Sequence, residues 1–530
     1  MGGQFRRPVL MPSRYRIGIT GVVQGVGFRP FVKRLADRLG IHGTVTNTGA
    51  GVLIEIDAER PSQAEGFTSA IRSEAPALAR IESLSLAALA FEGGTETPAG
   101  FSSFTILTSE AKAESFTLVS ADVASCPDCL REVNDPHDRR FGYAFTNCTN
   151  CGPRYSITTA VPYDRANTTM EPFRMCAECL REYTNPGDRR FHAEPTACPV
   201  CGPRLQIEPY AADALEFAIA ALQAGRIVAL RGLGGFQLAC DAHSNLAVER
   251  LRTIKRRSRK PFAVMMRDAE MVAAYCDVTP GELALLATGP APIVLVKMRA
   301  GKTLSPAIAP SLSELGVMLP GTPLHHLLFR SGLTCLVMTS GNISEEPIVI
   351  SSEGARRKLA PLCDALLTHD REIFMRVDDS VVRLHNGRPR LLRRARGYAP
   401  EAIDLGFEAH EVLACGADLK NTFCLTKGHY AVLSQHIGDM ENFETLEFFG
   451  ETLRKLKQVY RAAPRLIAHD PHPGYRTTRW ADSQPEPKIA VQHHHAHIAG
   501  CMAENGVHEK VIGIAFDGTG YGADGQSWGG

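Results

Sequence analysis

Four Cys-x-x-Cys pairs between residues 126 and 201 constrain this chain more than any other part of its sequence. Eighteen residues separate the first pair from the second, and eighteen separate the third from the fourth. The segment that begins CPDCLRE returns fifty residues later as CAECLRE, so the block is an internal duplication. The eight cysteines are Cys126, Cys129, Cys148, Cys151, Cys176, Cys179, Cys198 and Cys201.

This spacing predicts two closed structural Zn²⁺ sites. Two cysteines three positions apart in a tight turn direct both thiolates at one point, and two such turns supply the four sulfurs of a tetrahedral zinc site. Disulfides and redox-active pairs are the alternatives, but four pairs in a duplicated frame favour metal. The pairing stays open, because each repeat can bind its own ion or the two repeats can share ligands.

Length, charge and the remaining cysteines limit the number of domains, the kinds of partner and the cellular compartment. The 530 residues predict three to five domains. A net charge of +1 at pH 7 creates no overall field toward nucleic acid or a membrane, so we expect neither as a partner. The sequence has no run of eighteen apolar residues and no signal-type apolar core. The seven cysteines outside the block are scattered, which favours unpaired thiols in a reducing cytoplasm.

A glycine-rich loop near the N-terminus indicates an anion-binding site. Residues 16–23 alternate like a strand, the loop QGVGFRP follows at 24–30, and residues 31–39 have helical spacing. Glycines allow several backbone N–H groups to point at one place, and a helix N-terminus adds partial positive charge there. A tight turn without any ligand is the plain alternative.

The sequence around this loop resembles that of acylphosphatase. The matching segments are VQGVGFRPFV and the later GTVTN, and the resemblance defines an expected domain at residues 14–107. It implies a small α/β sandwich that hydrolyses an acyl phosphate without a metal ion. The residues implied in binding are Gly25, Gly27 and Arg29, with Asn47 orienting the attacking water.

A basic run, KRRSRK at residues 255–260, ends directly in an apolar strand expected at 263–266. A solvated surface is the usual explanation of a charge run, but here some cations must lie at the mouth of a strand, which suits a polyphosphate. Together with the segment TSGN at 339–342, the pattern resembles the YrdC/TsaC family, which binds ATP and makes carbamoyl-type adenylates. The resemblance implies nucleotide or carbamoyl contacts from Lys255, Arg257, Lys260, Ser340, Asn342, Arg376 and Arg394.

The last segment, residues 408–530, resembles the start of the actin-like, TsaD-type carbamoyl-transferring ATPases. We expect residues 423–425 and 430–433 to form a hairpin with a phosphate-facing turn between its strands. The sequence ends inside this fold, so we expect only its first lobe. An actin-like site lies between two lobes, and full carbamoyl transfer by this chain alone is therefore not expected.

A histidine cluster within this segment indicates a metal or substrate site. In a helix, His493 and His497 of the run QHHHAH are four positions apart and share one face. Neutral imidazoles in that arrangement can bind Zn²⁺ or Fe²⁺. Asp517, expected to follow a strand and to begin the phosphate-loop-like turn DGTGYG, offers a third ligand.

The order of these segments resembles the HypF family, the carbamoyltransferases of nickel–iron hydrogenase maturation. The resemblance implies a multidomain α/β and α+β chain. It would hold an acylphosphatase-like sandwich at 14–107, a double zinc module with four cysteines in each site at 120–206, a YrdC-like domain at 212–402 and an incomplete actin-like domain at 408–530. It also implies a relay in which carbamate from carbamoyl phosphate is joined to ATP with Mg²⁺. The carbamoyl group then passes to the C-terminal cysteine of a partner protein, HypE.

Two other functions stay open from the sequence. YrdC-type and TsaD-type relatives also make threonylcarbamoyl groups on tRNA, but the near-zero net charge and the acylphosphatase-like segment disfavour a tRNA-modifying enzyme. A non-catalytic zinc scaffold of the maturation machinery is the second alternative. It is disfavoured by the joint presence of Arg29, Asn47, Lys255, Ser340 and Asn342.

Overall fold

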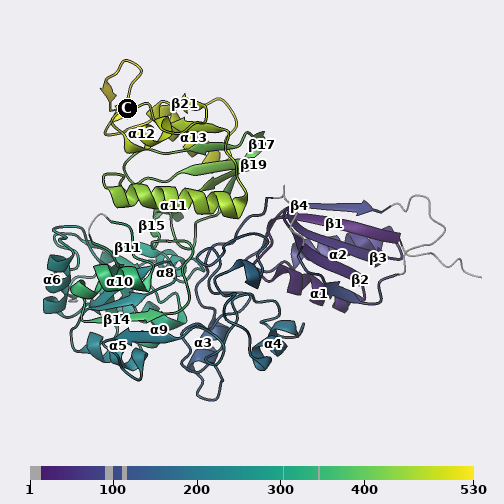
Figure 1. Ribbon diagram of the computed structural model, residues 1–530, viewed down its shortest axis with the longest axis horizontal. Helices are drawn as coiled ribbons and strands as arrows, with labels where there is room; N and C mark the ends of the chain where they lie inside the picture. The colour runs from purple at the N-terminus through teal and green to yellow at the C-terminus, as the bar shows by residue number, and fades with distance from the viewer. Residues whose placement is uncertain (1–12, 90–99, 110–115, 302–303, 344–345, 530) are drawn as a thin grey trace, which may run out of the picture.

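The computed structural model describes residues 13–89, 100–109, 116–301, 304–343 and 346–529 (Figure 1). Three larger β-sheets follow one another along the chain, with five, eleven and five strands. In these ranges no helix has both the length and the apolar character needed to cross a membrane.

The first sheet has the strand order β4-β1-β3-β2-β5, and two helices pack on one of its faces (Figure 1). Residues of β1 alternate between buried and more accessible positions, as expected for a sheet with one covered face. The loop between β1 and α1 places the glycine-rich segment at the N-terminus of α1. The elements are β1 Ser13–Val22, α1 Phe28–Leu39, β2 His42–Thr48, β3 Gly51–Ala58, α2 Pro61–Ser73, β4 Arg80–Ala88 and β5 Phe104–Ile106.

The cysteine block contains little regular structure. Two short helices, α3 Pro127–Asn134 and α4 Ala177–Thr184, occupy equivalent places in the two repeats, and each begins directly after a cysteine. The 3-10 turn Arg165–Asn167 lies between the repeats. The strand that follows the block, β6 Leu205–Glu208, pairs with β14 Ala365–His369 and so fastens the block to the central sheet.

The central sheet is mixed and runs β16-β15-β11-β12-β9-β13-β8-β7-β14-β6, with β10 paired to β11. Its further strands are β7 Val228–Arg231, β8 Phe236–Asp241, β9 Ala263–Met266, β10 Cys276–Asp277, β11 Ile293–Met298, β12 Glu314–Met318, β13 Cys335–Ser340, β15 Val381–His385 and β16 Arg388–Arg393. The helices are α5 Ala214–Gln223, α6 Asn245–Ile254, α7 Ala269–Tyr275, α8 Pro280–Leu286, α9 Pro323–Leu328 and α10 Ser352–Lys358, with a 3-10 turn at Ala360–Leu362.

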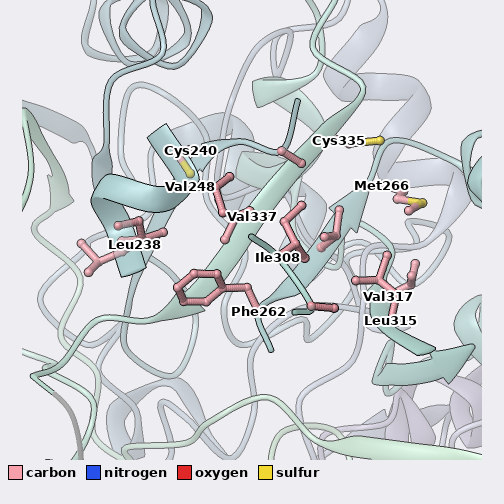
Figure 2. Close-up of a cluster of buried hydrophobic side chains, with 14 of the residues drawn as sticks. Leu238, Cys240, Val248, Phe262, Met266, Ile308, Leu315, Val317, Cys335 and Val337 are labelled. Carbon is pink, nitrogen blue, oxygen red and sulfur yellow. The ribbon is translucent and has the colours of Figure 1, made fainter. Parts of the chain in front are cut away.

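The middle strands of this sheet are buried along nearly their whole length. Such strands occur where both faces of a sheet are covered, and two apolar clusters lie on the two faces. Figure 2 shows part of one cluster, in which Phe262 and Ile308 lie beside Val337 of β13. This rigid core positions the loops that leave β8, β9 and β13.

The third sheet has the order β17-β19-β18-β20-β21, and the long helix α11 lies on the side of it that faces the central domain (Figure 1). Its elements are β17 Ala402–Ala409, β18 Val412–Ala414, β19 Cys424–Leu433, α11 Phe443–Tyr460, β20 Leu466–His469, α12 Arg476–Asp482, β21 Lys488–Ala490 and α13 His493–Glu504. A two-stranded ribbon of β22 Gly520–Tyr521 and β23 Ser527–Trp528 follows.

Two strand predictions in this region were wrong. Residues 423–425 and 430–433 do not pair as a hairpin, because β19 is one continuous strand whose two halves pair with different neighbours, β18 and β17. The strand expected before Asp517 is also absent from the described structure, because the apolar residues 511–516 have no strand beside them to pair with.

A buried histidine in α9 predicts acid sensitivity. His325 is 6% exposed, and neither ring nitrogen has a hydrogen-bond partner within the described residues. Burial lowers the pKa of His325 to about 3, with smaller effects of Asp379 and Arg396. The unfolded chain therefore binds a proton first as the pH falls below about 6.5, and stability is lost toward pH 3 by up to about 1.4 kcal/mol per pH unit.

We expect His325→Leu to weaken this pH dependence. The midpoint of thermal unfolding should fall less between pH 7 and pH 5 in His325→Leu than in the parent chain. The exposed His385 provides the control, since His385→Leu should leave the pH dependence unchanged. An equal fall in the parent chain and in His325→Leu would show that this imidazole is not held neutral by the fold.

Candidate functional site

Each repeat of the cysteine block gathers its own four sulfurs. Neighbouring Sγ atoms lie between 3.5 and 3.9 Å apart in both groups. Four sulfurs about 2.3 Å from a tetrahedral zinc ion lie about 3.8 Å apart, whereas a disulfide needs about 2.05 Å. The donor set and its dimensions therefore fit zinc. The first group is Cys126, Cys129, Cys148 and Cys151, and the second is Cys176, Cys179, Cys198 and Cys201.

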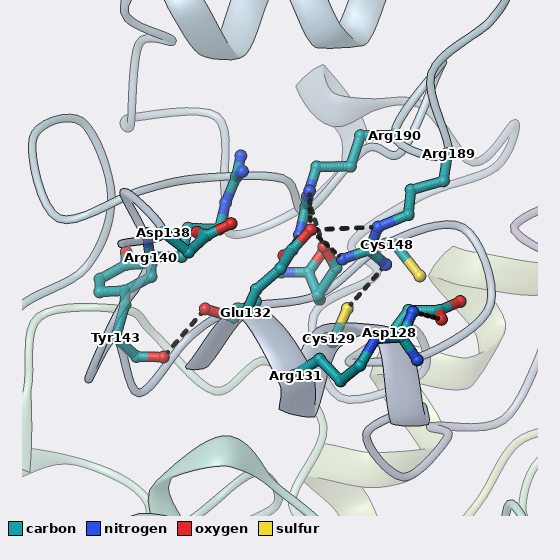
Figure 3. Close-up of polar contacts among 12 residues, drawn as sticks. Asp128, Cys129, Arg131, Glu132, Asp138, Arg140, Tyr143, Cys148, Arg189 and Arg190 are labelled. Carbon is teal, nitrogen blue, oxygen red and sulfur yellow. Dashed lines mark hydrogen bonds and ion pairs between the residues drawn. The ribbon is translucent and has the colours of Figure 1, made fainter. Parts of the chain in front are cut away.

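Arginines exchanged between the two repeats hold them together. Arg189 and Arg190 of the second repeat donate to Glu132 of the first (Figure 3). Arg139 and Arg140 of the first repeat donate to Glu182 of the second. Burial alone would raise the pKa of Glu182, but hydrogen bonds from Arg140 and Arg139 lower it to about 2. The repeated DRRF and CLRE motifs carried this signal in the sequence, and it was missed.

The same arginines also reach the sulfurs. Arg189 Nη1 lies 3.2 Å from Sγ of Cys129, and Arg139 Nη2 lies 3.2 Å from Sγ of Cys179. Guanidinium donors suit thiolates rather than thiols, which agrees with metal-bound cysteines. Each zinc site is therefore stabilised by a cation from the opposite repeat, and the block forms a single unit.

The glycine cradle brings Arg29 and Asn47 together. Gly25 and Gly27 both have φ of +72°, and Gly27 caps the N-terminus of α1. With its amide oxygen facing Arg29, Asn47 accepts from Nη2 at 3.2 Å and from Nε at 3.1 Å. The loop, the arginine and the asparagine thus form one compact site, although their roles in binding stay a prediction.

The cysteine block forms the other wall of this cradle. Arg154 Nε donates to the carbonyl of Gly25 at 2.7 Å, and the methyl and hydroxyl groups of Thr149 lie against Gly27. Arg29 itself donates to Asp164 at 3.1 Å and to Glu194 at 3.2 Å. These wall residues come from segments more than one hundred positions away in sequence, and no local pattern pointed to them.

The basic run and the TSGN segment meet at the ends of β9 and β13. Lys255 Nζ donates to Asn342 Oδ1 at 2.7 Å and to the Asn342 carbonyl at 3.1 Å, and Arg257 donates to Thr339 at 3.0 Å. Ser340 Oγ donates to Asn342 Oδ1 at 2.9 Å. Burial lowers the pKa of Lys255 to about 7, with further lowering by Arg257.

The other predicted nucleotide residues lie at the edge of this group or outside it. Lys260 is exposed, and its carbonyl accepts from Arg257. Arg376 donates to Glu451 at 3.2 Å and lies over the ring of Phe448, so it contacts α11. Arg394 donates to the Glu401 carbonyl. The last two contacts lie at the junction between the central domain and the third sheet, and a nucleotide role for either arginine stays a prediction.

The histidine cluster lies at the N-terminus of α13. His493 Nε2 is 2.8 Å from Asp517 Oδ2, and His497 Nε2 is 3.5 Å from the same oxygen. One ligand atom from each of the three residues lies within 4.8 Å of the others, which fits a divalent metal ion. The second nitrogen of His493 lies 2.5 Å from Asp470, a contact that fixes the ring as in many metal sites. Sequence reasoning missed Asp470, which follows β20.

Comparison with known proteins identifies the relatives of this chain. Carbamoyltransferase HypF2 of Cupriavidus necator is 48% identical over 547 residues, which cover 98% of this chain and 67% of that protein. The chain belongs to the HypF family. Carbamoyltransferase HypF of Rhizobium leguminosarum bv. viciae is also 48% identical, over 99% of this chain and 68% of its own length.

A solved HypF structure has the same fold. The crystal structure of full-length HypF in its phosphate- and nucleotide-bound form superposes with a TM-score of 0.94 at 47% identity. The match covers 99% of this chain and 69% of that one. This chain therefore spans about two thirds of the length of its HypF relatives.

Family models match the successive segments in the predicted order. They are described as acylphosphatase at residues 15–103, HypF finger at 126–158 and 175–208, telomere recombination (Sua5, YciO and YrdC) at 220–395, and HypF Kae1-like domain at 407–504. With the HypF structure, these matches confirm the predicted fold class and the predicted resemblance to the HypF family.

Proposed function

We propose that this chain is a carbamoyltransferase of hydrogenase maturation that releases carbamate at the Arg29 cradle and activates it at the Lys255 site. Membership of the HypF family supports the enzyme class, with its acylphosphatase and adenylate-forming domains. The observation that carries the assignment of the first site is the pairing of Arg29 with Asn47 beside the glycine loop, around one cavity.

The first step is hydrolysis of carbamoyl phosphate. Water held by Asn47 attacks phosphorus, the bond from phosphorus to the carbamoyl oxygen breaks, and carbamate and inorganic phosphate leave. Arg29 and the amides of Gly25 and Gly27 stabilise the charge that develops on the phosphoryl oxygens.

The second step joins carbamate to ATP. A carbamate oxygen attacks the α-phosphorus of ATP, and pyrophosphate leaves as carbamoyl adenylate forms. Lys255 and Arg257 lie at the strand ends where they can neutralise the polyphosphate, while Ser340 and Asn342 present polar groups beside it. Mg²⁺ bound to ATP would neutralise further charge on the phosphates.

The third step passes the carbamoyl group to the C-terminal cysteine thiol of HypE, and AMP leaves. An actin-like site lies between two lobes, and residues 408–530 would supply one of them. His493, His497 and Asp517 would hold a divalent ion, Zn²⁺ or Fe²⁺, in the domain where this transfer takes place. Such an ion would supply positive charge for binding phosphate or carbonyl oxygens. Asp470 would keep the His493 ring oriented toward it.

Carbamoyl-phosphate-dependent exchange of pyrophosphate into ATP tests the first two steps together. We expect exchange in the full chain and its loss in Arg29→Ala and in Lys255→Ala. Arg38→Ala on α1 and Arg259→Ala in the basic run are matched controls, because both side chains are exposed. Absence of exchange in the folded, zinc-loaded parent chain would contradict the proposal. Exchange supported by threonine and bicarbonate instead would indicate the threonylcarbamoyl alternative.

A further inference from the structure

The acylphosphatase cradle is completed by residues from outside its own domain. One cavity is lined by the loop residues and Asn47 on one side and by the cysteine block on the other. The contributors from the block include Thr149, Arg154, His192 and Glu194. The chemistry of this wall can therefore act on whatever group the phosphate carries.

Two carboxylates of the cysteine block contact Arg29 of the cradle, and one of them, Glu194, lines the cavity. Glu194 Oε1 and Asp164 Oδ1 both accept from Nη2 of Arg29. The Glu194 side chain is 1% exposed, and its other oxygen accepts from the Tyr183 hydroxyl at 2.9 Å and from the Arg165 backbone N–H at 3.0 Å. The carboxyl group of Glu194 is thus fixed in position by groups that do not belong to the cradle.

Carboxylates are not expected beside a phosphate-binding site, because their negative charge repels the phosphate group. The fold reduces this repulsion in two ways. Burial raises the pKa of Glu194 to about 7, so its negative charge is incomplete near neutral pH. Arg154 is 2% exposed and hydrogen-bonds through its guanidinium to three backbone carbonyls, which leaves its charge available to the cavity. The carboxylates therefore serve something other than phosphate binding.

We propose that Glu194 and Asp164 recognise the amino group of carbamoyl phosphate and so make the site selective for a carbamoyl over an acyl group. Carbamoyl phosphate and acetyl phosphate have nearly the same shape and differ by an NH₂ group in place of CH₃. Carboxyl oxygens accept hydrogen bonds from the NH₂ group, whereas a methyl group would leave the buried Glu194 oxygen without that donor. The inference rests on the proposed function and identifies the residues that would select its substrate.

Substrate binding would exchange the partners of Arg29. The phosphoryl oxygens take the guanidinium Nη2, and the oxygens of Glu194 and Asp164 that it releases face the carbamoyl end. The two N–H bonds of the amino group then replace the donor that the carboxylates have lost. Arg29 is buried with only 8% of its side chain exposed, so this exchange takes place away from bulk water.

The test compares hydrolysis of carbamoyl phosphate and acetyl phosphate by the full chain. We expect the parent to prefer carbamoyl phosphate in kcat/KM by at least tenfold. Glu194→Leu, which removes both acceptors from a buried position, should lower this preference at least tenfold while acetyl phosphate hydrolysis is retained. Glu194→Gln, which keeps one acceptor, and Asp164→Asn should give intermediate preferences. The exposed Glu171 provides the control, since Glu171→Gln should keep the parental preference.

Two results would overturn the inference. One is a parent chain that hydrolyses both substrates equally well. The other is a set of Glu194 and Asp164 variants that keep two zinc ions, and the parental unfolding midpoint, yet lose both activities in equal proportion. If the parent chain hydrolyses neither substrate, the proposed function itself fails. The rate of Arg29→Ala defines the hydrolysis that counts as no activity.

Discussion

Removal of zinc is expected to abolish carbamoyl phosphate hydrolysis, although the proposed hydrolysis uses no metal ion. The wall of the cradle is built on the turns that carry the cysteines, since Thr149 follows Cys148 and Arg154 lies three residues after Cys151. Metal binding supplies roughly 10–16 kcal/mol of folding free energy per site in zinc-finger peptides. Without it the block loses its fold, and the Arg154 hydrogen bond to Gly25 is lost with it.

Cys151→Ser tests this with less disruption than a chelator. We expect no more than one zinc ion per chain. Phosphate release should fall a hundredfold or more, because the glycine loop loses its hydrogen bond from Arg154. Metal analysis and a phosphate-release assay on the same sample measure both effects. Cys363→Ser is the control, since Cys363 lies outside both clusters. Full activity in a Cys151→Ser chain that has lost zinc would show that the structure of the cradle does not depend on the metal.

The features that could be predicted from the sequence are those that depend only on residues close together in the chain. The Cys-x-x-Cys spacing, the glycine loop and the polar ends of β13 are all local, and each lies in a tight turn or at a strand end in the structure. The pairing of cysteines within each repeat could not be predicted, because the same spacing allows ligands to be shared between the repeats.

The features that sequence reasoning missed depend on long-range packing. Glu194 lies 165 positions from Arg29, and nothing near either residue reports the contact. The continuity of β19 was missed for a related reason, because a polar stretch resembles a turn until strands on both sides are known. The arginine contacts between the repeats could have been predicted, since the DRRF motif occurs in both repeats and should make the same contact in each.

Lys255 is expected to take up a proton when ATP binds. Burial holds the pKa of its amino group at about 7, so at pH 8 only about a tenth of the free chains carry the charge. Phosphate oxygens beside the amino group favour the charged form and raise its pKa in the complex. Binding at pH 8 should therefore consume about 0.9 proton, and the affinity for ATP should fall about tenfold per pH unit above pH 7.

Titration calorimetry in two buffers of different ionisation enthalpy measures this uptake directly. At pH 8 the phosphates of ATP are already fully ionised, so the proton must go to the protein. Lys255→Met should remove the uptake and the pH dependence and should abolish pyrophosphate exchange, whereas Arg259→Ala should keep all three near parental values. Uptake that persists in Lys255→Met would assign the proton to another group. An affinity that is constant from pH 7 to pH 9 would mean that the lysine is charged before ATP arrives, and that its hydrogen bonds to Asn342 already offset the cost of burying the charge.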